Sequence, residues 1–105
     1  MSLRGRKLGI LISAPPDRAN FRHGLKLAES ALNQGVLVYL YCIDDAVKGV
    51  KTDELQRLRE RGLNLFACAY AAQRRGIAVS EAAAFGGLGV LSDVISATDR
   101  FVSFN

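Results

Sequence analysis

Asn64-Leu-Phe-Ala-Cys-Ala-Tyr-Ala-Ala-Gln-Arg-Arg-Gly-Ile77 is the stretch that decides the fold, because its pattern changes from strand to helix at a single residue. It opens with an apolar run typical of a buried strand and becomes an alanine-rich helical segment directly at Cys68. Side chains at such a junction lie at the carboxyl edge of a parallel sheet, where ligands commonly bind. The stretch therefore predicts an α/β fold with a thiol at that edge.

The chemistry expected of Cys68 follows from the helix behind it. Unpaired N–H groups and the dipole at a helix start favour a negative charge, and the thiolate is the reactive form of cysteine. Its small neighbours, Ala67, Ala69, Ala71 and Ala72, predict an uncrowded and accessible sulfur. The alternative is an inert, buried thiol that acts as a small hydrophobic side chain.

Outward from this stretch, apolar runs alternate with helical patterns. The expected strands are continuous and apolar, as in a sheet covered on both faces, and glycines 35 and 62 end the helices that separate them. A last helix is expected to turn Leu88, Leu91, Val94, Ile95 and Thr98 inward. The expected strands cover 8–12, 36–42, 63–68 and 101–104, and the expected helices 20–34, 52–61 and a last one from about residue 88. This alternation predicts one domain, 1–105, built as a three-layer α/β/α sandwich around a mainly parallel sheet of four to five strands. Residues 1–6 are expected to be a disordered basic tail.

Composition excludes several classes of function. The net charge is +4, but Arg4, Arg6 and Lys7 supply three of the fourteen basic residues, which leaves eleven against ten acidic ones. This balance gives no basic face for direct nucleic-acid binding. No apolar run reaches the roughly 18 residues of a membrane span, so a cytoplasmic location without membrane contact is expected. Two cysteines and one histidine cannot form a zinc site, and no cofactor is expected.

Other candidate residues have competing interpretations. Cys42 is interpreted as a core residue at a strand end rather than a resolving thiol, and His23 as an ordinary helix residue rather than a base for Cys68. For Arg74 and Arg75 the sequence favours helix capping over direct contact with the sulfur, since they follow Cys68 by about two helical turns.

A candidate crevice is predicted at the carboxyl edge. Ser13 and Asp17 follow the first strand and Gly87 opens the last helix, so these residues are candidates to line a crevice there. Both polar side chains are equally expected as helix or turn caps. The glycine cluster 86–89 is interpreted as a hinge or, alternatively, as an anion-binding loop.

The motifs together resemble a known family. Leu65-Phe-Ala-Cys68 with its alanine-rich helix, Arg74-Arg75-Gly76-Ile77, Gly87-Leu-Gly-Val-Leu-Ser92 and the segment 98–104 resemble the DsrE-like sulfur-relay family, of the TusD/DsrE type. The resemblance implies the same α/β architecture and a sulfurtransferase role in which Cys68 carries a persulfide. It also implies sulfur donor and acceptor proteins, and a homo-oligomer (trimer or hexamer) or a complex with sister DsrE-like subunits. The short segment 76–85 departs from the family pattern and bears on which partner binds.

Two functions therefore remain open. The first is an intracellular sulfur relay that accepts and donates sulfane sulfur on Cys68. The second is a non-catalytic α/β scaffold, or a subunit binding a small anion or a partner, in which Cys68 is inert.

Overall fold

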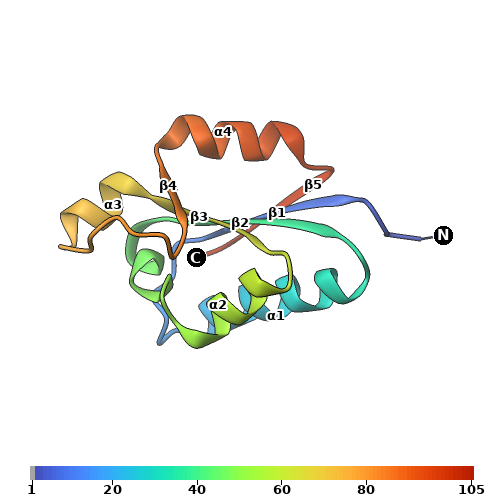
Figure 1. The fold of residues 1–105 in the computed structure, drawn as a ribbon, viewed down its shortest axis with the longest axis horizontal. Coiled ribbons are helices and arrows are strands. Elements are labelled where there is room, and N and C mark those ends of the chain that lie inside the picture. Colours follow the sequence, from blue (N-terminus) through green and yellow to red (C-terminus); the bar gives the residue numbers. More distant parts are fainter. Residues whose placement is uncertain (1) are drawn as a thin grey trace.

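The protein is a five-stranded parallel sheet with helices on both faces, which confirms the predicted α/β fold (Figure 1). The computed structural model describes residues 2–105, so Met1 of the expected tail lies outside the described residues. The elements are β1 (Lys7–Ile12), α1 (Ala19–Asn33), β2 (Leu37–Cys42), the 3-10 helix η1 (Asp44–Gly49), α2 (Asp53–Glu60), β3 (Asn64–Cys68), α3 (Ala69–Arg74), β4 (Ala84–Gly86), α4 (Leu88–Ala97) and β5 (Arg100–Phe104). The helices α1 and α2 cover one face, and α4 lies over the other.

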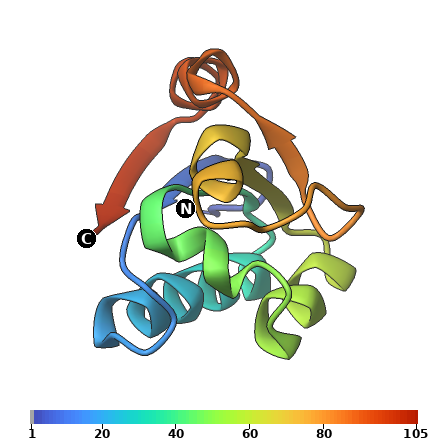
Figure 2. The same cartoon turned by 90° about the vertical axis from the view of Figure 1, so that its left-hand side faces the viewer.

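The strands follow the order β4-β3-β2-β1-β5, and every neighbouring pair is parallel. Their carboxyl ends therefore meet at one edge of the sheet. Figure 2 is turned toward this edge and shows α3 in front of the sheet, below α4. The residue after the end of β3 thus begins a helix that projects beyond this edge of the sheet rather than lying along a face (Figure 1).

The core lies mainly between the sheet and the α1–α2 layer. Ile10, Ile12, Val38 and Leu40 point to that layer and are fully buried. The other face is covered less completely, because a single helix lies over it, and Leu37 is 44% exposed there. The two-sided burial expected from continuous apolar strands is therefore complete on one face only.

Glycines end the first two long helices, as the sequence predicts. Gly35 follows α1 with φ +78° and Gly62 follows α2 with φ +109°. A left-handed residue at this position closes the last turn of a helix, and glycine adopts it without a steric penalty. Both helices can therefore turn back at once toward the next strand.

The orientation of α4 differs from the prediction. Val94 is buried, but Leu88 and Ile95 are 65% and 47% exposed, so the expected inner stripe is wrong for these two residues. Apolar residues occupy more than one side of α4, and only one side of the helix can pack against the sheet. The helix therefore leaves an apolar strip on the protein surface.

The expectation of disorder is wrong for the amino-terminal residues 2–6, because they make backbone hydrogen bonds with the turn before β2 and with its first residue. The Gly5 N–H donates to the Gly35 carbonyl, and the Leu37 N–H donates to the Arg6 carbonyl, at 3.0 and 2.8 Å. No helix within residues 2–105 has the length and apolar character needed to cross a membrane.

Candidate functional site

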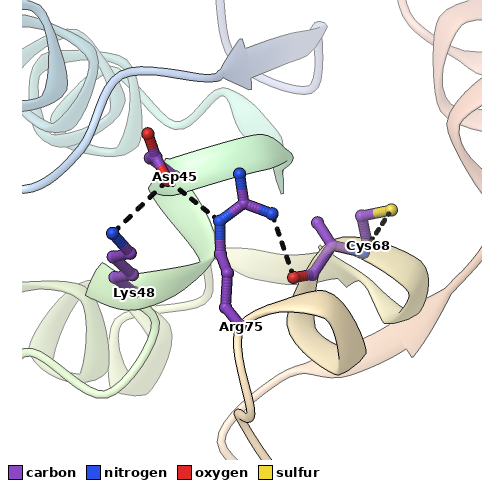
Figure 3. A network of polar contacts seen from close by, with 5 residues as sticks. Asp45, Lys48, Cys68 and Arg75 are labelled. Carbon is purple, nitrogen blue, oxygen red and sulfur yellow. Dashed lines mark hydrogen bonds and ion pairs between the residues drawn. The ribbon is translucent and has the colours of Figure 1, made fainter.

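Cys68 is both the last residue of β3 and the N-cap of α3, as its position in the sequence predicts. Its Sγ atom accepts a hydrogen bond from the backbone N–H of Ala71 at 3.4 Å (Figure 3). This is the interaction that a serine or threonine oxygen makes at an ordinary N-cap. The sulfur therefore receives a donor that is fixed by the backbone of the helix.

The sulfur is not open to solvent. Cys68 is 5% exposed, so the accessibility expected from its small neighbours is wrong for the isolated chain. A residue distant in sequence lies beside it: Gly86 of β4 is directly opposite Cys68 in the sheet. Reaction with a thiol of another protein therefore requires local movement around the buried sulfur.

Tyr41 contributes to the site, although no motif in the sequence distinguishes it from the other apolar residues of its strand. Its hydroxyl donates to the carbonyls of Gly86 and Gly87, both at 3.1 Å. Burial, followed by the adjacent Cys68 thiol, raises the pKa of Tyr41, so the phenol remains a hydrogen-bond donor. The available signal was strand alternation, which places Tyr41 on the same sheet face as the strand end that carries the thiol.

Arg75 makes polar contacts at the C-terminal end of α3. Its Nε donates to Asp45 Oδ1 at 2.9 Å, and Nη1 donates to the Ala71 carbonyl at 3.1 Å (Figure 3). The hydrogen bond from Arg75, with a further contribution from Lys48, lowers the pKa of Asp45. The predicted helix-capping role is confirmed for Arg75. Because Ala71 also donates to Cys68, one residue connects this polar network to the thiol.

Arg74 lies against its own helix. Its Nη1 donates to the Tyr70 hydroxyl at 3.0 Å, and its guanidinium carbon lies 5.8 Å from the centroid of the Tyr70 ring. Both side chains are exposed. This pair accounts for Arg74 without any contact to the sulfur.

Cys42 is a core residue at the end of its strand, which is the interpretation that the sequence favoured. It is fully buried and lies opposite Ala67 in the sheet. Neighbouring residues of a strand point to opposite faces, so Cys42 and Cys68 lie on different sides of the sheet. Burial raises the pKa of Cys42 to about 12. Both thiols are free, and the structure does not bring them together.

Ser13 lies at the carboxyl end of β1, away from Cys68. Its hydroxyl donates to Asn105 Oδ1 at 2.9 Å, and Asn20 Nδ2 donates to the Asn105 carbonyl at 2.8 Å. These residues border an open hollow of about 550 Å³. His23 is exposed and pairs with Asn20 at 3.2 Å, so it lies at this end of the sheet rather than at the thiol.

The other predicted crevice residues are spread along the same edge. Asp17 is exposed in the loop before α1. Gly87 follows β4, whereas Ser13 follows β1, and the sheet order places β3 and β2 between them. That is three strand spacings, or about 14 Å. The structure does not gather Ser13, Asp17 and Gly87 into one hollow, and a ligand crevice formed by them stays a prediction.

Comparison with known proteins agrees with this architecture. The DsrE/DsrF-like family matches residues 6–104. Among solved structures, the YchN protein from E. coli superposes with a TM-score of 0.79 and 18% sequence identity, covering 95% of this chain and 99% of that one. At this identity the likeness shows the fold alone. No curated protein sequence matches significantly. Since the family match extends over nearly the whole chain, the protein belongs to the DsrE/DsrF-like family.

Proposed function

We propose that this protein is a sulfur-relay protein that accepts sulfane sulfur as a persulfide on Cys68 and donates it to an acceptor cysteine. Family membership provides the sulfur-relay context. The observation that carries the proposal for this residue is the N-cap position of Cys68, where the Ala71 N–H donates to Sγ. A thiolate or persulfide anion at this position keeps that donor and gains from its partial positive charge.

The proposed reaction consists of two thiolate exchanges. The Cys68 thiolate attacks the outer sulfur of a donor persulfide, forming a new S–S bond, while the donor's S–S bond breaks and its own thiolate leaves. An acceptor thiolate then attacks the outer sulfur on Cys68, and the Cys68 thiolate is restored. The electrons of each broken bond remain on the leaving thiolate, so the sequence requires no oxidant, metal or organic cofactor.

Cys68 is a better carrier than Cys42 on physical grounds. Burial raises the pKa of Cys42 to about 12, so that thiol remains protonated at neutral pH. Both thiols are part of the buried core, but Cys42 lies inside the sheet opposite Ala67, whereas Cys68 lies at the sheet edge where α3 begins. A partner protein therefore needs to displace only local structure to reach Cys68.

The alternative function is a scaffold that binds a small anion. The hollow bordered by Ser13, Arg18, Asn20 and Asn105 supports this reading, because it offers polar groups and one cation near the start of α1. In that case Cys68 would be an inert capping residue. The two functions differ in whether the protein takes up sulfur.

Mass spectrometry of the intact protein after incubation with polysulfide, and separately with a persulfidated donor protein, separates them. Wild type and Cys42→Ser are expected to gain the mass of one sulfur atom, and Cys68→Ser to gain none. If wild type remains at its unmodified mass with both donors, or if all three proteins gain sulfur equally, the carrier proposal fails. Calorimetric titration of sulfate into Cys68→Ser then tests the scaffold function, with binding expected only if the hollow is the site.

The oligomeric state implied by the family forms part of the proposal. Leu37, Leu88 and Ile95 are exposed on the α4 face of the sheet, and Asp93 is the only charged residue of α4. Such a patch is typical of a surface covered by another subunit. A trimer or hexamer of this chain, or a complex with sister subunits, would bury it.

Light scattering with a matched pair of variants tests the assembly. Ile95→Glu is expected to shift the protein toward the monomer. Val79→Glu, a control at a residue that is also exposed but lies in the loop before β4, is expected to keep the wild-type mass. A monomeric wild-type protein at micromolar concentration would contradict the homo-oligomer.

A cytoplasmic location completes the proposal. Cys42 and Cys68 are both free, and a persulfide relay depends on cysteines that are not locked in structural disulfides.

A further inference from the structure

The Tyr41 side chain spans three strands of the sheet. Tyr41 belongs to β2, whereas the carbonyls that accept its proton belong to Gly86 of β4 and to Gly87, and β3 lies between β2 and β4. Gly86 lies directly opposite Cys68. The phenol must therefore cross β3 at the level of Cys68, on the face that carries the thiol.

The two accepting carbonyls flank the point where the chain leaves the sheet. Gly86 ends β4, and Gly87 is the N-cap of α4, with no side-chain hydrogen bond closing that helix start. Val90 of α4 packs closely on Gly86, since a Cβ atom there would lie 2.6 Å from its Cγ2. The Tyr41 hydroxyl thus fixes both the end of β4 and the start of α4.

We propose that Tyr41 is a positioning residue: its hydroxyl holds the Gly86–Gly87 segment, here called the joint, in place beside Cys68 and so controls access to the sulfur. The pair of hydrogen bonds from Tyr41 to the joint is called the latch. A fully buried phenol held by two carbonyls keeps the joint closed, and Cys68 is 5% exposed as a result. Breaking these hydrogen bonds frees the two glycines, whose backbone moves readily.

The latch rests on the proposed function, and it adds to that function a control over which molecules reach the sulfur of Cys68. A closed joint protects a persulfide on Cys68 from small thiols in solution. A protein partner that opens the joint while docking at the carboxyl edge exposes the outer sulfur only to its own cysteine. The class of partner is therefore a protein bearing a persulfide or an acceptor thiol, rather than a free small thiol.

The test is the rate at which iodoacetamide alkylates Cys68 in the full-length chain, followed by peptide mapping. Tyr41→Phe removes the hydroxyl and keeps the ring, and is expected to raise the rate about five-fold, which corresponds to one hydrogen bond of about 1 kcal/mol. Tyr39→Phe, a control on the same strand and face opposite Asn64, is expected to react like wild type. Labelling of Cys42 reports general loosening and is expected to stay slow in each variant.

An unchanged Cys68 rate in Tyr41→Phe would overturn the latch, and so would an equal acceleration of Cys42 and Cys68. A second variant keeps the test open if Tyr41→Phe folds poorly. Gly87 has φ −93° and free space around an added Cβ, so Gly87→Ala should fold and stiffen the joint. Labelling of Cys68 is then expected to slow by about two- to five-fold, and a faster rate would contradict the latch.

Alkylation requires no sulfur transfer, so the two proposals fail separately. Faster labelling in Tyr41→Phe, without sulfur uptake by wild type from either polysulfide or a persulfidated donor protein, would retain the latch and refute the carrier function. Sulfur uptake on Cys68, together with an unchanged labelling rate in Tyr41→Phe, would retain the carrier function and refute the latch.

Discussion

Replacing each cysteine by serine should destabilise the protein unequally, and the structure sets the order. Cys42 is fully buried among apolar side chains, so the hydroxyl of Cys42→Ser has to be desolvated without a fixed partner. That costs about 1–3 kcal/mol. At Cys68 the Ala71 N–H already points at the substituted atom, and serine is a preferred N-cap residue. We therefore expect Cys68→Ser to cost less than about 1 kcal/mol.

Thermal unfolding followed by circular dichroism measures this difference. For a domain of this size each kcal/mol corresponds to roughly 4–8 °C in Tm, so Cys42→Ser should melt about 4–24 °C below wild type and Cys68→Ser less than about 8 °C below it. All proteins are compared at one concentration, because assembly makes Tm depend on concentration. A larger loss for Cys68→Ser than for Cys42→Ser would refute the assignment of Cys42 to the core and of Cys68 to the helix cap.

Three further predictions concern reactivity and packing. Iodoacetamide at graded pH should label Cys68 before Cys42, because burial raises the pKa of Cys42 to about 12; the reverse order would contradict the site. The pKa of Asp45 is lowered from 3.8 by Arg75, so the stability this pair adds should be present above pH 3.8 and be lost as the pH falls below it. Acid titration monitored by circular dichroism should show this loss in wild type and not in Asp45→Asn. Gly24→Ala should cost about 1–3 kcal/mol in urea unfolding, because its Cβ would lie 2.6 Å from a core isoleucine, and a neutral effect would contradict that packing.

The sequence predicts the sheet well for a physical reason. Strands buried in a parallel sheet are continuous apolar runs, and the glycines at 35 and 62 mark where helices end. The same pattern does not orient α4, because its apolar residues cover more than one side and only tertiary packing decides which side turns inward. β4 has three residues, which is too short for a periodic signal.

The candidate site is predictable only in part. The local change from strand to helix identifies Cys68, because a junction and its N-cap are formed by neighbouring residues. Its burial is not visible in the local sequence, because Tyr41 and the Gly86–Gly87 segment approach this region from other parts of the chain. Small side chains next to a thiol indicate local space, but they do not show what fills that space from elsewhere in the chain.

The most direct test of the central claim is a transfer experiment with a trapped product. Wild-type protein is loaded with a persulfidated donor protein or with polysulfide, freed of excess donor and mixed with an excess of a low-pKa protein thiol, and peptide mapping then follows the sulfane sulfur. We predict that the extra sulfur is found first on the peptide containing Cys68, and then on the acceptor as the Cys68 peptide returns to its unmodified mass. Extra sulfur confined to Cys42, or none on either cysteine, would contradict the relay.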